Sequence, residues 1–303
     1  MPKNVLIVVA GPTAIGKTPT AIKIAQKYQT EILSADSRQF YIEMNIGTAK
    51  PSLDELSQVK HHFINSHSIT DKFSVGDFEV QGLKTLEDLF KTHHVIVLAG
   101  GSGLYINAIC NGFDALPKAN PGIREELNLT YQDKGIEYLQ TELERVDPDY
   151  FLEVDTENPQ RMIRALEVYH STRIPFSAYR TSKIKNRPFK IIKIGLNIHR
   201  EQLYQQINHR VNVMMDAGLL KEVEQLLPYR DLNALNTVGY SELIQYLDGK
   251  LNLNEAVEKI EQNTRRFAKR QLTWFKKDKE ITWFEPDQIA DIFEFLSCKI
   301  ENN

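Results

Sequence analysis

One eight-residue motif constrains the fold of this chain more than any other feature. Residues 11–18 read GPTAIGKT and satisfy the pattern GxxxxGK[ST]. The motif directly follows an apolar, β-branched run at residues 5–10, and it precedes residues 18–28, whose apolar positions recur at helical spacing. A glycine-rich loop between a buried strand and a helix is typical of a site that wraps a chain of phosphate groups. The sequence therefore predicts an α/β fold with a phosphate-binding loop at its start.

Each part of this loop has a chemical task. The glycines let the backbone turn its amides inward, and the start of the following helix adds positive potential. Lys17 supplies a charge, and the hydroxyl of Thr18 can ligate Mg²⁺. The ligand is expected to be a diphosphate or longer, bound by the following residues: Gly11, Pro12, Thr13, Ala14, Ile15, Gly16, Lys17 and Thr18.

The rest of the chain supplies a sheet, its helices and one interruption. Further buried strands are expected at residues 31–35, 95–99 and 190–196. Amphipathic helices are expected at residues 203–215, 219–227, 255–276 and 289–296. Residues 117–187 differ in texture, because they carry charged helical patterns, proline breaks and no clear buried strand. These features predict a parallel sheet with crossover helices and a helical insertion.

A carboxylate ends the second predicted strand. Asp36 follows residues 31–35 at the carboxyl edge of the sheet, where open α/β folds place their ligands. Its position allows a metal ligand, a helix cap or a catalytic base. The strand at residues 95–99 runs instead into Gly100 and Gly101, without the terminal Asp that ATP-hydrolysing proteins use to hold Mg²⁺.

Charge must be distributed locally if the chain binds nucleic acid. The net charge is −3, from 37 Lys and Arg against 40 Asp and Glu, which excludes a uniform polycation. One predicted helix carries basic residues at i, i+1, i+4 and i+5, and the series continues beyond it: Arg265, Arg266, Lys269, Arg270, Lys276, Lys277 and Lys279. This stripe predicts an RNA-binding face, with a merely solvated helix face as the alternative.

Other features point to few additional functions. No apolar run approaches the roughly 20 residues of a membrane span. The two cysteines lie far apart without CxxC spacing, so neither disulfides nor a zinc site are expected, and a reducing cytoplasm fits best. The histidine pairs at 61–62 and 93–94 predict no metal site. Trp274 and Trp283 could stack on bases, but core or interface packing is the expectation.

An ordered series of motifs resembles one known family. It comprises residues 11–18, 36–39 (DSRQ), 45–51 (NIGTAKP), 61–62 (HH), 100–105 (GGSGLY), 158–167 (NPQRMIRALE) and 264–271 (TRRFAKRQ). The series spans nearly the whole chain and is similar to that of the tRNA dimethylallyltransferases. These enzymes attach an isoprenoid to the exocyclic amine of an adenosine beside the anticodon.

The resemblance implies a fold and a reaction. The fold is α/β, with a P-loop kinase-like parallel sheet flanked by helices as the catalytic core (residues 1–116 and 188–303) and a helical insertion domain that contacts tRNA (residues 117–187). The reaction moves a dimethylallyl group from dimethylallyl diphosphate to N6 of adenosine 37 and releases diphosphate. The implied partners are Mg²⁺ and the anticodon stem-loop of tRNA, for a cytoplasmic monomer. Prenylation of free adenine nucleotides, a small-molecule kinase and an RNA-binding protein with a relic loop remain alternatives.

The resemblance also assigns roles to residues. Asp36 would accept the proton of the amine, while Lys17, Thr18 and Arg210 would stabilise the leaving diphosphate. The target base must be flipped out of its stack to be read. The implied tRNA contacts are Asp36, Ser37, Arg38, Gln39, Ser102, Arg124, Gln160, Arg161, Met162, Ile163 and Arg164. Ser102 stands where relatives usually have threonine, and residues 235–238 lack the arginine that many relatives carry there.

Overall fold

The computed structural model describes residues 4–114, 116–118, 120–180 and 184–301. Its sheet is parallel throughout, in the order β3-β2-β4-β1-β5-β6. The strands are β1 (Val5–Ala10), β2 (Ile32–Ser34), β3 (His61–His62), β4 (Val95–Gly100), β5 (Lys190–Leu196) and β6 (Thr282–Phe284). The predicted parallel α/β sheet is confirmed. The two edge strands, β3 and β6, were not predicted, because each is too short and too little buried to give an apolar run.

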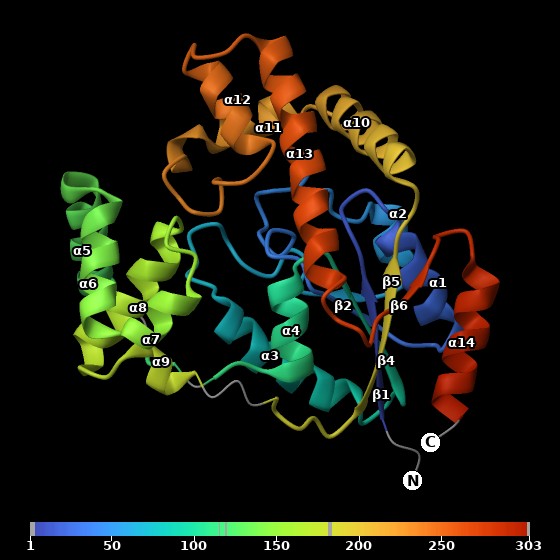
Figure 1. Cartoon of the computed structure of the whole chain (residues 1–303). Coiled ribbons are helices and arrows are strands. Elements are labelled where there is room, and N and C mark those ends of the chain that lie inside the picture. Colours follow the sequence, from blue (N-terminus) through green and yellow to red (C-terminus); the bar gives the residue numbers. More distant parts are fainter. Residues whose placement is uncertain (1–3, 115, 119, 181–183, 302–303) are drawn as a thin grey trace. The chain divides into compact units, whose positions relative to one another are not determined.

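Helices cover both faces of the sheet and its carboxyl edge. They are α1 (Lys17–Lys27), α2 (Leu53–Gln58), α3 (Val75–Leu89), α4 (Gly103–Asn111), α10 (Arg200–Asp216), α11 (Leu219–Leu226), α12 (Tyr240–Leu247), α13 (Leu253–Phe275) and α14 (Ile289–Glu301), with a short 3-10 turn at Leu227–Tyr229. In Figure 1, α3 and α4 lie on one side of the strands, and α1 and α14 lie on the other.

Alternation along β1 explains this arrangement. Leu6 and Val8 belong to a buried cluster with residues of α3 and α4, whereas Ile7 and Val9 belong to a second cluster with residues of α1 and α14. Successive side chains of a strand point to opposite faces, so an apolar residue at every position needs cover on both sides. The central strand is therefore fully buried.

Helices α10 to α13 lie beyond the carboxyl ends of the strands (Figure 1). The predictions of α10, α11, α13 and α14 are confirmed, while α12 was not predicted. This placement puts polar residues of α10 and α13 opposite the loops that leave β1, β2 and β4. These loops carry the residues on which the candidate site depends.

The chain divides into two compact units, described separately here. The core unit comprises Met1–Asn111 and Asn186–Asn303, and the insert unit comprises Gly112–Lys185. The insert unit begins and ends a few residues before the expected limits of 117–187. Arg187 explains the difference at the second boundary, because it donates to the carbonyls of Ala108 and Ile109 and pairs with Glu79 of α3.

The described part of the insert unit is helical, and its proline breaks turn out to be helix starts. Its helices are α5 (Pro121–Lys134), α6 (Ile136–Val146), α7 (Pro148–Glu153), α8 (Pro159–Thr172) and α9 (Phe176–Tyr179). Asn120, Asp147 and Asn158 each accept a backbone N–H of the helix that follows, with proline at its first position. Among the described residues, no helix is both long and apolar enough to cross a bilayer.

Candidate functional site

A cavity of about 410 Å³ opens at the carboxyl edge of the sheet, entirely within the core unit. The phosphate loop, the segment after β2 and the segment after β4 supply part of its wall. Helices α10 and α13 supply residues to the rest. The cavity brings together these predicted site residues: Thr13, Ala14, Ile15, Gly16, Lys17, Thr18, Asp36, Ser37, Arg38, Gln39, Ser102 and Arg210.

The phosphate loop has the backbone that its motif requires. Ala14 and Gly16 have positive φ values of 64° and 93°, which turn the chain sharply before α1 begins at Lys17. Such left-handed turns help to direct successive amides into a concave anion site. Gly11 and Pro12 are buried, so they support the loop rather than line the cavity.

Two cations share the loop end of the cavity. Lys17 Nζ donates to the Pro12 carbonyl at 2.6 Å, and Arg210 Nη1 donates to Thr13 Oγ1 at 3.3 Å. Burial, and then the positive charge of Arg210, lower the pKa of Lys17 to about 7, although Asp36 opposes this shift. Burial also lowers the pKa of Arg210. An anion between these groups would relieve the repulsion, which makes this end of the cavity suited to diphosphate.

Asp36 caps a turn and lines the same cavity. Its Oδ1 accepts hydrogen bonds from the backbone N–H of Arg38 at 2.9 Å and of Gln39 at 3.3 Å. Residues 37–40 form a turn, because the chain returns at once toward the segment at 65–67. Asp36 therefore caps a turn and not a helix. The carboxylate is thus held in a fixed orientation, and its negative charge acts to raise the pKa of Lys17.

The cavity wall that carries Asp36 is tied to the segment that follows β4. The Ser37 amide donates to Ser102 Oγ at 2.9 Å, and the Ser102 amide donates to the Ala35 carbonyl at 3.2 Å. A Cβ on Gly100 would lie only 2.1 Å from that carbonyl oxygen, so this close approach requires glycine. Ser102 therefore fixes the segment that carries Asp36.

Two of the predicted base-reading residues already have partners in the chain. Gln39 Nε2 donates to the carbonyls of Thr48 and Ala49, and its Oε1 accepts from Ser34 Oγ. Arg38 Nη2 donates to the Asn233 carbonyl at 3.1 Å. Both side chains hold loops of the cavity in place, and their contact with a base stays a prediction. Thr237 and Val238 line the cavity, and they belong to the segment at residues 235–238 that lacks the arginine of many relatives.

Gln271 of α13 was not identified as a site residue. The Thr13 amide donates to its Oε1, and its Nε2 donates to the Gly101 carbonyl, both at 2.8 Å. A Cβ on Gly101 would lie 2.4 Å from Nε2, so the glycine makes room for this bond. One buried amide thus joins the phosphate loop to the loop after β4. The motif at 264–271 contained this residue, but only the fold reveals its partners.

Glu222 of α11 was also missed. Its carboxylate accepts from the backbone N–H groups of Asn45, Ile46 and Gly47, and from the hydroxyl of Tyr240 at 2.5 Å. The ring of Tyr240 fills the space where a Cβ on Gly47 would lie. These contacts hold residues 45–47 in place, and residues 47–51 line the cavity. An acidic residue in an amphipathic helix gave no sequence signal of this role.

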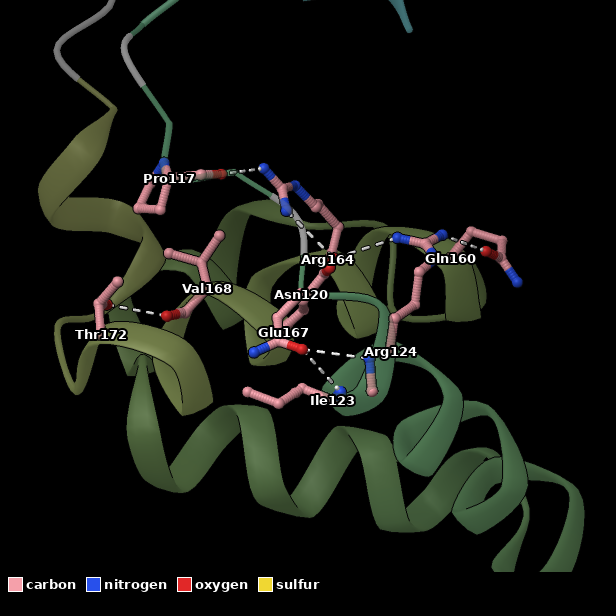
Figure 2. A network of polar contacts seen from close by, with 10 residues as sticks. Pro117, Asn120, Ile123, Arg124, Gln160, Arg164, Glu167, Val168 and Thr172 are labelled. Carbon is pink, nitrogen blue, oxygen red and sulfur yellow. Dashed lines mark hydrogen bonds and ion pairs between the residues drawn. The ribbon is translucent and has the colours of Figure 1, made fainter. Parts of the chain in front are cut away.

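Two of the three predicted arginines of the insert unit converge on one buried carboxylate, as Figure 2 shows. Arg124 of α5 and Arg164 of α8 contact Glu167 Oε2 at 3.2 and 3.1 Å, and the Glu167 side chain is only 1% exposed. Arg124 also donates to Gln160 Oε1 at 2.9 Å, and Arg164 to the Pro117 carbonyl at 2.9 Å. The two guanidinium groups are held in place by contacts within this unit.

The neighbouring predicted contacts on α8 differ from one another. Arg161 is exposed, but Met162 and Ile163 are completely buried in the core of the insert unit. Their side chains therefore pack against the protein and offer no surface to RNA. The exposed positions of α8 follow its helical period, whereas the predicted contacts were a continuous run of residues from Gln160 to Arg164.

The basic stripe of α13 is also uneven. Arg265 is half-buried and donates to Asn208 of α10 at 2.6 Å, whereas Arg266, Lys269 and Arg270 are exposed. In the described part of the chain, no group of three or more His, Cys, Asp or Glu side chains is arranged to hold a metal ion. His61 lines the cavity, and its Nδ1 hydrogen bonds with the Val59 carbonyl.

Comparison with known proteins gives a consistent result. Residues 39–278 match the sequence model of a family described as IPP transferase. A tRNA dimethylallyltransferase of Christiangramia forsetii is 52% identical, over 98% of this chain and 99% of its own length. One from Cytophaga hutchinsonii is 46% identical, over 98% and 97%.

Solved structures agree with these relatives. The tRNA isopentenylpyrophosphate transferase of Bacillus halodurans superposes with a TM-score of 0.74 at 34% identity, over 99% of this chain and 98% of its own. The corresponding transferase of Staphylococcus epidermidis gives 0.71 at 30% identity, over 99% of both chains.

Proposed function

The chain belongs to the IPP transferase family, and on that premise we propose that it prenylates tRNA. It transfers the dimethylallyl group of dimethylallyl diphosphate to N6 of adenosine 37, next to the anticodon, and releases diphosphate. The observation that carries this proposal is the cavity itself. It places a phosphate loop with two cations beside a carboxylate that is held by two backbone amides.

The donor side stabilises the leaving group. When the allylic C–O bond breaks, negative charge develops on the diphosphate and carbocation character develops on carbon. Lys17, Arg210 and the amides of the loop are positioned to bind that charge. The Thr13 amide donates to Gln271, so this amide fixes the loop and is not available to bind the ligand.

The acceptor side prepares a weak nucleophile. The lone pair of an adenine amine is delocalised into the ring, so removal of its proton as the C–N bond forms assists the attack. Asp36 accepts this proton, because its carboxylate lines the cavity and is oriented through Oδ1. The balance is one C–N bond formed, one C–O bond broken and one proton transferred to Asp36.

Mg²⁺ fits the residues at the donor end. Mg²⁺ prefers oxygen ligands and is usually bound through one or two protein groups together with phosphates and water. Thr18 offers a hydroxyl and Asp36 a carboxylate at the same cavity. Thr18 would hold the ion together with the diphosphate, whose charge the ion would neutralise.

Recognition of tRNA is divided between the two units. Ser37, Arg38, Gln39 and Ser102 contact the flipped adenosine in the cavity of the core unit. The insert unit supplies Arg124, Gln160, Arg161 and Arg164 to the anticodon stem-loop, and their side chains are exposed or half-buried. The chain acts as a monomer in the cytoplasm, where its RNA substrate is found.

A transfer assay tests the proposal. The enzyme is incubated with carbon-labelled dimethylallyl diphosphate and either unmodified tRNA or AMP. We expect label in tRNA alone, and none with Lys17→Ala. Label in AMP would indicate a nucleotide prenyltransferase, and transfer of γ-phosphate from ATP would indicate a kinase.

A further inference from the structure

Two large aromatic side chains lie exposed on one side of α13. Phe267 and Trp274 are 39% and 46% exposed, although rings of this size usually bury most of their surface. They are seven residues apart, which places them two turns apart on the same side of the helix. Arg270 lies between them, at i+3 from Phe267. We call Phe267 and Trp274 the aromatic stripe.

Core or interface packing was the expectation for both tryptophans. Core packing is wrong for Trp274, whose packing at an interface stays a prediction, and it is confirmed for Trp283. Trp283 packs against the buried cluster on the α3 and α4 side of the sheet. The ring of Trp274 instead rests on Gly103, where a Cβ would lie 2.2 Å from Cδ1 and 2.3 Å from Nε1. The indole is thus held against the first residue of α4 while nearly half of its surface faces solvent.

The aromatic stripe borders the cavity. Phe267 lines the cavity itself, and Gly103, under the Trp274 ring, directly follows the cavity residue Ser102. On the cavity side of the stripe, Thr264 and Gln271 also line the cavity. An extended ligand that leaves this part of the cavity would therefore lie close to the stripe.

The opposite side of the stripe is basic. Arg266 and Arg270 are exposed there, and the Arg270 guanidinium lies 5.9 Å from the centroid of the Phe267 ring. Aromatic faces beside exposed arginines are typical of surfaces that bind unpaired nucleic acid, where bases stack and phosphates meet positive charge. Neither a small diphosphate nor a free nucleotide is long enough to contact both the aromatic rings and the exposed arginines.

We propose that the aromatic stripe stacks an unpaired base next to the target adenosine, with Trp274 as the main platform and Arg266 and Arg270 facing the backbone. The inference rests on the proposed function. Flipping the adenosine out of its stack leaves a neighbouring base without a partner, and an aromatic side chain can replace that partner. Stacking of this kind tolerates any base, because every base has a π face.

Steady-state kinetics test the platform. Trp274→Ala raises the KM for tRNA by roughly tenfold, while the KM for dimethylallyl diphosphate and kcat at saturating tRNA stay within about twofold, because the cavity is unchanged. Trp274→Phe retains an aromatic face and recovers most of the loss. Thr273→Ala is the matched control, because Thr273 is the exposed residue next to Trp274 in the chain. An unchanged KM for tRNA in Trp274→Ala would overturn the proposal.

Fluorescence observes the stacking directly, because the chain contains only two tryptophans. The Trp283→Phe protein reports on Trp274 alone, and we expect tRNA to quench its emission over the concentration range in which tRNA binds. The Trp274→Phe protein should show no quenching. Binding of tRNA to both proteins without any quenching would overturn the stacking and leave the proposed function intact. Absence of tRNA binding and transfer in the wild-type enzyme would overturn both.

Discussion

At the residue scale, Asp36 combines two tasks that a substitution can separate. One oxygen caps the turn at residues 37–40, and the carboxylate faces the cavity. Asn can still accept both amide hydrogen bonds, but it cannot take a proton. The structural and the chemical role of Asp36 therefore predict different outcomes for Asp36→Asn and Asp36→Ala.

For Asp36→Asn we expect a loss of about 10² to 10⁴-fold in kcat, because a positioned general base contributes on that order. The KM of both substrates and the thermal midpoint should stay close to those of the wild type. Asp36→Ala should also lower the thermal midpoint, because it removes the cap. Single-turnover transfer and thermal unfolding measure the two effects. Full turnover by Asp36→Asn would contradict the role as base.

Lys17 predicts a pH dependence of donor binding. Its pKa of about 7 in the free protein means that Lys17 loses its charge as pH rises above 7, whereas a bound diphosphate favours the protonated form. The affinity for dimethylallyl diphosphate should therefore be full below pH 7 and fall by up to about tenfold per pH unit above it. Titration of binding between pH 6 and 9 tests this. Lys17→Arg stays charged and should give a flat profile if it binds.

The sequence was sufficient for residues whose chemistry is local. Lys17 and Thr18 lie within one contiguous motif, and Asp36 lies at the end of a strand, so spacing alone located them. Glu222 and Gln271 hold loops that lie 170 or more residues away in the chain. No local pattern distinguishes such a side chain from an ordinary helix residue.

At the element scale, the same limit holds. Long buried strands such as β1 were predictable from a continuous apolar run, and amphipathic helices such as α13 from apolar residues that recur at helical spacing over several turns. The short edge strand β3 and the turn after Asp36 depend on contacts with neighbouring segments. Helix α13 illustrates the difference: its basic residues were predicted from their spacing, but its cavity-facing side was not.

The bridge from α13 to two loops gives a prediction. Gln271→Met keeps the size of the side chain but removes both hydrogen bonds, leaving the Thr13 amide and the Gly101 carbonyl without this partner. We expect kcat to fall by about tenfold or more, because the donor and acceptor loops lose their fixed spacing. Gln262→Met, at an exposed position of the same helix, is the matched control.

The Gln271 measurement includes stability. A loss of activity that is matched by a large fall in the thermal midpoint would indicate only a structural role. Gln271→Glu keeps the acceptor for Thr13 and loses the donor to Gly101, so it should lie between Gln271→Met and the wild type if the two bonds contribute separately.

At the scale of the whole molecule, a net charge of −3 coexists with local basic surfaces. Exposed basic residues gather on α13, and α8 of the insert unit presents Arg161 to solvent. Because RNA binding releases counterions, the affinity for tRNA should fall steeply with salt, while the affinity for dimethylallyl diphosphate in its partly enclosed cavity should fall less.

Arg161→Ala tests the part played by the insert unit. Removal of one phosphate contact should weaken tRNA binding and reduce the salt slope by about one, without affecting the donor. Arg145→Ala is the control, because Arg145 is equally a surface arginine of this unit but pairs with Glu142. Equal effects of the two variants would argue against a specific contact by α8.

The most direct test of the central claim is to identify the product nucleoside and its position. After reaction with dimethylallyl diphosphate, unmodified tRNA is digested and its nucleosides are identified by mass. The account predicts one N6-dimethylallyladenosine per tRNA, at position 37, and none in tRNA with guanosine there. Modification at another position, or none with wild-type enzyme and both substrates present, would contradict it.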